Sequence, residues 1–165
     1  MTIEVREVRP EEHAEAGEVT ADSYREFARE GDPDWPVYLQ RIADVRGRAA
    51  LAMVLVAIED GRILGTVTLE LDGRIDGDHG TLASDEAHIR MLGVHPDARG
   101  RGIGPLLMDA CEERARAAGR TLITLNTAGQ MEAAQRMYGS LGYERGEDWR
   151  FSEDFVLLSY SKQLV

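Results

Sequence analysis

The chain has 165 residues, a length that fits one domain spanning residues 1–165. Its 43% hydrophobic and 30% charged residues are typical of a globular protein and not of a disordered one. The formal net charge of -11 argues against nucleic acid and anionic membranes as partners, and either attracts a cationic substrate such as an amine or serves solubility alone.

Apolar periodicity and turn residues divide the chain into strands and helices, with no internal repeat and no linker. The predicted strands span residues 2–8, 51–58, 63–71, 86–94, 121–126 and about 155–160, and the predicted helices span 10–27, 36–46, 103–119 and 131–141. Asp60-Gly61 lies between two β-rich runs and is the strongest hairpin signal. The Gly- and Asp-rich segment 72–85 predicts a loop.

The order of these elements predicts an α+β or α/β fold. A three-strand meander leads into a β-α-β crossover, which must be right-handed. Helices that follow strands in this order cover both faces of the sheet that the strands form. We therefore expect a mixed central sheet with helices on both sides.

Several classes of site are excluded by residues that the sequence lacks. Cys111 is the single cysteine, which rules out an intramolecular disulfide and a multi-cysteine metal site, and its place on the apolar face of a helix predicts a core residue. The histidines lack metal-ligand spacing, and no Gly-x-Ser-x-Gly elbow is present. No signal peptide is evident and no apolar run approaches the roughly 20 residues of a membrane span, so we expect a cytoplasmic protein.

The segment Arg99–Gly104 lies between the strand that ends at Val94 and the helix that begins at Ile103. Its three glycines at alternate positions let backbone amides approach a ligand without a Cβ in the way. The helix start adds N–H donors and a partial positive charge, and Arg99 and Arg101 add guanidinium donors. The segment therefore predicts a site for an anionic pyrophosphate.

Two other phosphate loops are excluded by spacing. A Walker A loop needs Gly-Lys-Ser/Thr before its helix, whereas Gly104 is followed by Pro105 and Leu106. A dinucleotide fingerprint, Gly-x-Gly-x-x-Gly counted from Gly100, would put its third glycine at Pro105. It also expects a strand at the start of a β-α-β unit and an acidic residue about 20 positions further on. Neither loop fits.

The pattern that fits is Arg-x-x-Gly-x-Gly after a strand that ends in Val-x-Pro, which resembles the GNAT superfamily of N-acetyltransferases. The match extends over the strand, loop and helix of residues 86–115, and over 133–144 with its Tyr-x-x-x-Gly-Tyr ending. Residues 155–164 resemble the last strand of the family. The resemblance implies a mixed, mostly antiparallel sheet of six to seven strands flanked by helices, and acetyl-CoA as co-substrate without a metal.

The resemblance also implies which residues bind the cofactor. A bulged strand opens away from its neighbour, and its backbone pairs with pantetheine as a further strand would. The implied set is Leu92, Gly93, Val94, Arg99, Gly100, Arg101, Gly102, Ile103, Gly104, Asn126 and Tyr138. Asn126 fits a turn residue equally well. Pro105 removes one N–H donor, and Met131 stands where the family often has an asparagine, so both depart from the family pattern.

For catalysis, Tyr138 matches the tyrosine that the family commonly places beside the sulfur as an acid, although it also fits the apolar face of its helix. Glu86, His88 and Arg90 alternate along one strand and share a face, which in the family looks into the acceptor site. His88 and Glu86 are the candidate bases, since histidine titrates near neutrality. The alternative is a partly solvated face without a role.

The implied function is an N-acetyltransferase, an acyltransferase acting on a small-molecule or peptide amine by direct attack in a ternary complex. Two alternatives stay open: another acyl-CoA, with Arg90 facing a carboxylated donor, or a CoA-binding sensor without catalysis. The acceptor is not encoded in a readable motif, although an acidic lip of Asp32, Asp34, Asp76 and Asp78 would favour polyamines. Family members often form homodimers.

Overall fold

The computed structural model describes residues 2–28, 31–72, 82–150 and 156–164. The α-helices are α1 (His13–Tyr24), α2 (Trp35–Ala43), α3 (Val45–Leu51), α4 (Ile103–Ala117) and α5 (Glu132–Ser140). The 3-10 helices are η1 (Pro10–Glu12), η2 (Arg25–Phe27) and η3 (Pro96–Ala98). The strands are β1 (Glu4–Glu7), β2 (Met53–Glu59), β3 (Arg62–Glu70), β4 (Glu86–Val94), β5 (Leu122–Ala128), β6 (Glu144–Arg145), β7 (Trp149–Arg150) and β8 (Val156–Gln163). Asp76 and Asp78 lie outside the described residues.

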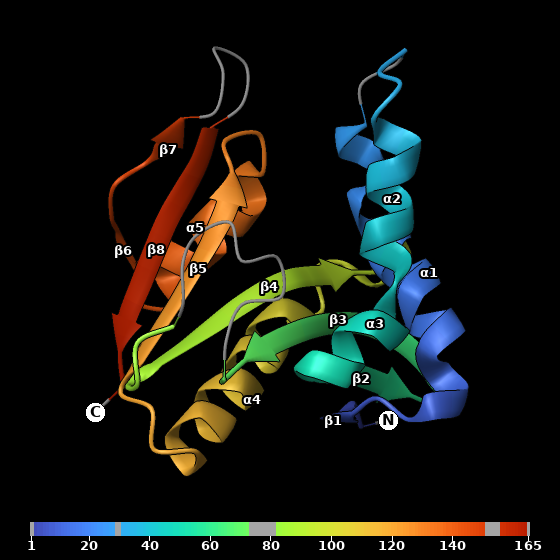
Figure 1. Cartoon of the computed structure of the whole chain (residues 1–165). Helices are drawn as coiled ribbons and strands as arrows, with labels where there is room; N and C mark the ends of the chain where they lie inside the picture. Colours follow the sequence, from blue (N-terminus) through green and yellow to red (C-terminus); the bar gives the residue numbers. More distant parts are fainter. Residues whose placement is uncertain (1, 29–30, 73–81, 151–155, 165) are drawn as a thin grey trace.

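The strands form one mixed sheet in the order β1-β2-β3-β4-β5-β8-β6, with β7 also paired to β8 (Figure 1). The β4–β5 pair is parallel and the other pairs are antiparallel. The predicted fold class is confirmed. The described part of the sheet has eight strands because β6 and β7 add two residues each to the expected core.

The β2–β3 hairpin and β4 match the sequence prediction closely. Asp60 has φ 52° and Gly61 has φ 78°, so both turn residues adopt the positive φ that a type I′ turn requires. β4 begins and ends at the predicted residues, Glu86 and Val94. The loop after β4 then leads into α4 at Ile103, also as predicted.

The segment between α2 and β2 was predicted wrongly in part. The expected second helix ends at Ala43, and a further helix, α3, runs from Val45 to Leu51. Asp44 breaks the chain between them and caps α3, because its side chain accepts a hydrogen bond from the Gly47 N–H. Leu51, predicted to begin a strand, is the last residue of this helix and is exposed.

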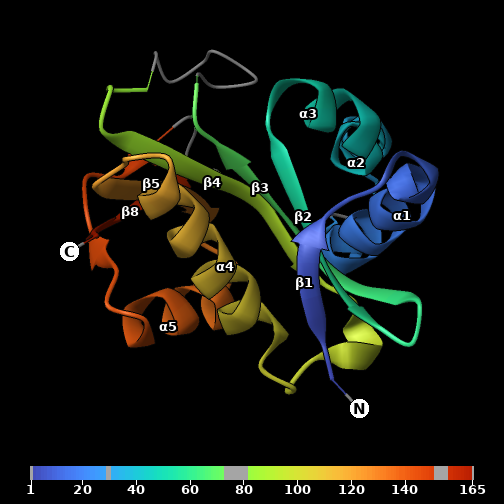
Figure 2. The ribbon, with the colours of Figure 1, turned by 90° about the horizontal axis from the view of Figure 1, so that it is seen from below.

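Helices cover both faces of the sheet, α4 and α5 on one side and α1, α2 and α3 on the other (Figure 2). The larger apolar cluster joins the inner face of α4 to β2–β5 and β8 and includes Leu55, Ile89, Leu107 and Ile123. A second cluster lies under α1 and α3 and includes Val45 and Val56. Among the described residues, no helix is long and apolar enough to span a bilayer.

Candidate active site

The sheet opens between β4 and β5. The parallel pairing of these strands runs from Glu86–Leu122 to Ile89–Leu125, and within the described strands it extends no further. Figure 1 shows the two strands diverging beyond this point. The rest of β4 stays paired to β3, and the rest of β5 to β8. One edge of each strand therefore lacks its neighbour over several residues.

A β-bulge marks the point where β4 turns away. Arg90 pairs with Thr68 and Gly93 with Thr66, so Met91 and Leu92 together oppose a single residue of β3. Met91 has φ 54°, a positive value that is uncommon for any residue other than glycine. The predicted pantetheine segment, residues 92–94, begins inside this bulge.

Helix α1 covers the bulge with Tyr24 and Ser23. The Tyr24 hydroxyl donates a 3.1 Å hydrogen bond to the carbonyl oxygen of Leu92. A Cβ on Gly93 would lie 2.1 Å from the Ser23 Oγ, so glycine is required where the helix crosses the strand. Burial, followed by the proximity of Tyr138, raises the pKa of Tyr24. Sequence reasoning missed Tyr24 because this contact joins α1 to a strand far along the chain.

The glycine-rich loop at the start of α4 presents open backbone. Gly100 has φ 80° and Gly102 has φ 78°, and a Cβ at either position would meet no atom within 4 Å. In the part of the chain that the structure describes, no backbone group accepts a hydrogen bond from the N–H groups of residues 100–104. These amides and the N-terminus of a 15-residue helix together form a site suited to an anion.

The two arginines of the loop are held by carboxylates. Arg99 forms an ion pair with Glu26, and Arg101 donates two hydrogen bonds of 3.1 and 2.6 Å to Glu59. The side chain of Glu59 raises the pKa of Arg101 through these hydrogen bonds. Both guanidinium groups therefore have protein partners at the rim of the loop, which the sequence prediction of guanidinium donors for a pyrophosphate did not include.

Gly104 and Met131 have structural roles that the motif did not reveal. A Cβ on Gly104 would lie 2.8 Å from the sulfur of Met137, so this glycine lets α4 pack against α5. Met131 precedes α5, and its sulfur accepts a 3.6 Å hydrogen bond from the Thr127 hydroxyl. These two positions are thus explained by packing at the junction between β5, α4 and α5.

Tyr138 is buried on α5 among aromatic residues. Its ring centroid lies 5.6 Å from that of Tyr160 and 6.1 Å from that of Tyr143. Burial, and then the neighbouring Tyr160 and Cys111, raise the pKa of Tyr138. The hydroxyl is therefore protonated at neutral pH and can act as a proton donor. Cys111 is fully buried and its pKa is raised to about 12, as expected for an inert core thiol.

The face of β4 that carries the candidate bases is buried and internally connected. His88 is 5% exposed and Glu86 is 8% exposed, which contradicts the alternative of a solvated face. Nδ1 of His88 lies 2.8 Å from the Thr124 Oγ1, and this hydroxyl donates to Oε2 of Glu86. Glu70, fully buried on β3, is the cross-strand partner of His88.

A cavity of about 160 Å³ opens beside His88. Asn126, Ser159 and Trp149 also line it, from β5, β8 and β7. The Ser159 hydroxyl donates a 3.1 Å hydrogen bond to Oδ1 of Asn126, so the Asn126 side chain belongs to this polar face. The cavity is small and suits the tip of an acceptor such as an amino group.

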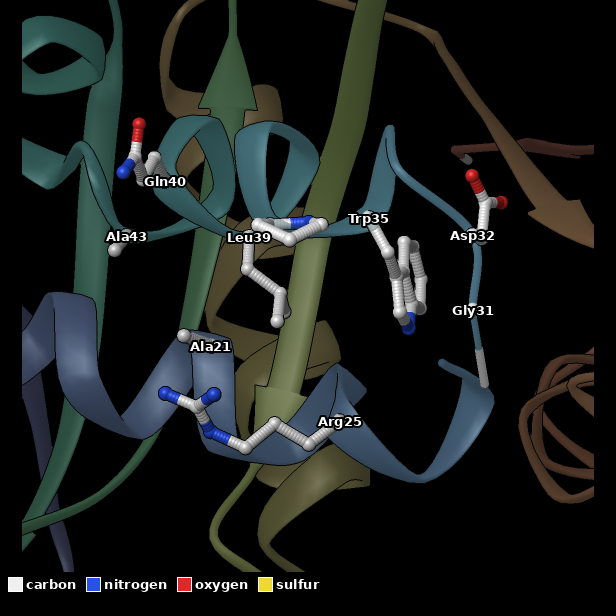
Figure 3. Close-up of a pocket in the computed structure, with 9 residues that line it drawn as sticks. Ala21, Arg25, Gly31, Asp32, Trp35, Leu39, Gln40 and Ala43 are labelled. Carbon is white, nitrogen blue, oxygen red and sulfur yellow. The ribbon is translucent and has the colours of Figure 1, made fainter. Parts of the chain in front are cut away.

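A larger cavity of about 550 Å³ lies between α1 and α2. A Cβ on Gly17 would lie 2.2 Å from the Ala43 carbonyl oxygen, so glycine lets α1 pass close to the end of α2, and the cavity runs along α2 from Trp35 to Ala43. Figure 3 shows Leu39 and Trp35 pointing from α2 toward α1, with Arg25 on the α1 side. Among the described residues, no cluster of His, Cys, Asp or Glu could hold a metal ion.

This chain is similar to known acetyltransferases in sequence and in fold. The model of the acetyltransferase (GNAT) family matches residues 18–143, which contain the bulge, the glycine loop and Tyr138. The Salmonella typhimurium protein yncA, solved with its cofactor acetyl-CoA, is 22% identical with a TM-score of 0.71, over 100% of this chain and 95% of that one.

Two further solved structures share the architecture. The PaiA N-acetyltransferase of Thermoplasma acidophilum, in complex with coenzyme A, is 17% identical with a TM-score of 0.74, over 96% of this chain and 98% of that one. A GNAT-family acetyltransferase of Staphylococcus aureus Mu50 is 19% identical with a TM-score of 0.73, over 99% and 100%. At these identities the likeness concerns the fold.

Proposed function

Because the chain belongs to the acetyltransferase (GNAT) family, we propose that it transfers an acetyl group from acetyl-CoA to a primary amine in a ternary complex. The observation that carries the proposal is the opening between β4 and β5 beside the unpartnered amides at the start of α4. Two solved structures of this fold hold acetyl-CoA or CoA, which supports the same ligand here.

The residues present fit such a ligand at both of its ends. The unpaired edge of β4 at residues 92–94 offers backbone donors and acceptors to the amide groups of pantetheine. The open amides of residues 100–104 offer donors to the pyrophosphate. Pro105 carries no N–H, so we expect the pyrophosphate to receive one backbone hydrogen bond fewer and to bind more weakly.

Acetyl-CoA, when bound, supplies an acyl group activated as a thioester. The chain contributes proximity, by holding donor and acceptor on the two sides of the opened sheet. A backbone N–H at Leu92 or Gly93 is the group that we assign to polarise the acyl carbonyl. His88 removes a proton from the acceptor ammonium. Glu86 is connected to His88 through the hydroxyl of Thr124.

Tyr138 is the acid that we assign to the departing sulfur. Its raised pKa keeps the hydroxyl protonated through the neutral range, as a proton donor requires. The buried site of Tyr138 also suits a group that acts away from water.

The direct test is an assay of an amine library with acetyl-CoA that reads the released thiol. The proposal predicts turnover with one or more primary amines and no turnover with tertiary amines. Calorimetry with CoA provides the second measurement. CoA binding without acetylation of any amine would overturn the catalytic part and leave a CoA-binding sensor, whereas absence of CoA binding would overturn the whole proposal.

The glycine loop offers a matched pair of variants for CoA binding. Gly102 and Gly119 have φ of 78° and 79°, and a Cβ would meet no atom within 4 Å at either. Both Gly→Ala changes therefore cost about 1–2 kcal/mol of backbone strain. We expect G102A to raise the Kd for CoA at least about tenfold, because the Cβ sits among the phosphate donors, and G119A to leave it unchanged. Equal Kd values in calorimetry would remove the loop from the site.

A further inference from the structure

The hydroxyl of Thr124 lies between the two candidate bases, His88 and Glu86. Thr124 stands on β5 directly across from His88 in the parallel register, and Glu86 lies one pleat upstream on β4. The Thr124 Oγ1 is 2.8 Å from Nδ1 of His88 and also bonds to Oε2 of Glu86. The other carboxylate oxygen, Oε1, accepts a 3.1 Å hydrogen bond from the backbone N–H of Ala83. One hydroxyl therefore links both bases.

The number of protons in this chain of bonds fixes their direction. A threonine hydroxyl has a single hydrogen, and a carboxylate can only accept. When the hydroxyl donates to Glu86, its oxygen is left to accept from His88, which requires a hydrogen on Nδ1. The neutral imidazole then carries its lone pair on Nε2. The opposite tautomer would place two lone pairs against each other between His88 and Thr124.

We propose that Thr124 is a positioning residue that holds His88 in the Nδ1–H tautomer, so that Nε2 is the basic nitrogen, and couples the ring to Glu86. The inference rests on the proposed function for its catalytic meaning and on the hydrogen-bond geometry for the tautomer. When His88 takes the acceptor's proton on Nε2, the bond from Nδ1 strengthens, and the carboxylate of Glu86 stabilises the imidazolium through the intervening hydroxyl.

Glu86, His88 and Thr124 are held rigidly because they lie where β4 and β5 are still paired. They lie at the last paired residues before β4 and β5 separate, where the strands still fix each other's register. His88 is buried, and the opposite face of the same strand is the apolar core. A fixed ring is what a general base needs, since misplacement by a fraction of an ångström weakens proton transfer.

Other charged groups near His88 also affect its titration. Glu70 on β3 is its cross-strand partner, Glu86 and Arg90 precede and follow it on β4, and Tyr160 on β8 lines the same cavity. Because all of these remain when Thr124 is changed, a difference between variants at position 124 reports the hydroxyl alone.

The test compares Thr124→Val, which keeps the shape and removes the hydroxyl, with Thr124→Ser, which keeps the hydroxyl. We expect T124V to lower kcat tenfold to a hundredfold with little change in KM, and to move the acidic limb of the kcat/KM profile to lower pH. We expect T124S to keep the wild-type kcat and the wild-type position of the acidic limb. T127V is the control, since Thr127 is buried on the same strand but faces α5, where it bonds to Met131.

A second measurement needs no turnover. In ¹⁵N-histidine-labelled protein, the signals lost in H88Q identify His88, and the nitrogen shifts report which ring nitrogen bears the hydrogen. We expect Nδ1–H in the wild type and in T124S, and a shift toward Nε2–H in T124V. A wild-type ring with Nε2–H, or unchanged kcat and tautomer in T124V, would overturn the inference. If the chain acetylates no amine, the spectra still decide the tautomer, so the two proposals fail separately.

Discussion

The two faces of the paired strands β4 and β5 differ sharply although the same backbone carries both. Toward α4 the strands present the buried apolar residues Ala87, Ile89, Ile123 and Leu125. Toward the other side they present Glu86, His88, Thr124 and Asn126. Side chains along a strand point alternately to its two faces, so a residue packed in the core and a candidate catalytic residue can be neighbours in sequence. Substitutions on the two faces are therefore expected to separate stability from activity.

His88→Gln tests the polar face and has the largest expected effect. Removing the base lowers kcat by about 10²- to 10⁴-fold, because the acceptor ammonium loses its proton acceptor. The midpoint of thermal unfolding changes little, since glutamine can keep a hydrogen bond to Thr124. The measurement is steady-state kinetics beside a melting curve. A variant that keeps full turnover across the pH range would remove His88 from the mechanism.

Ile89→Ala tests the apolar face one residue further along β4. Ile89 is 1% exposed and packs in the larger core cluster. Loss of its buried atoms and the resulting cavity should lower the free energy of unfolding by about 2–5 kcal/mol. Urea denaturation provides this value. At a temperature where the variant is folded, kcat should stay within about threefold of the wild type, a difference of about 0.7 kcal/mol in the barrier. A drop in kcat as large as that of H88Q would show that the faces are coupled.

The sequence predicted the parts of this contrast that depend on local pattern. The alternation of β4 was readable because polar and apolar residues change places at every step from Glu86 to Met91. The β2–β3 turn was predictable because Asp-Gly tolerates positive φ at both positions. The loop before α4 was recognised from glycine spacing, and its open backbone agrees with that prediction.

The parts that were missed depend on contacts between distant segments. Tyr24 over the bulge, Thr124 between the bases, and the Glu59 partner of Arg101 each join residues more than thirty positions apart. A single sequence gives no register between β4 and β5, so the alignment of His88 with Thr124 could not be predicted. The short helix α3 was missed because Leu51 continued an apolar run that is otherwise a strand.

Tyr138→Phe tests whether a residue of the apolar cluster also takes part in catalysis. Tyr138 belongs to the apolar cluster, yet its hydroxyl is the assigned acid. A thiolate leaves more easily than an alkoxide, so we expect a moderate loss of about tenfold in kcat, equal to about 1.4 kcal/mol. Because burial raises the pKa of Tyr138, the wild-type hydroxyl stays protonated through the neutral and moderately alkaline range, and the loss in kcat should be the same throughout that range. Unchanged kcat across pH would make Tyr138 a packing residue only.

The smallest expected effect is the loss of stability at alkaline pH that burial of the same hydroxyl causes. Burial raises the pKa of Tyr138 above that of a tyrosine in the unfolded chain, near 10. The unfolded state therefore loses its proton first, and the stabilisation that is complete below pH 10 is lost as the pH rises further. At pH 10.5 this group alone should cost about 0.8 kcal/mol relative to neutral pH. Urea midpoints measured from pH 8 to 11 should fall less steeply for Tyr138→Phe than for the wild type. Parallel curves would mean that Tyr138 ionises as readily in the folded protein as in the unfolded one, and would place its hydroxyl in water and not in the apolar cluster.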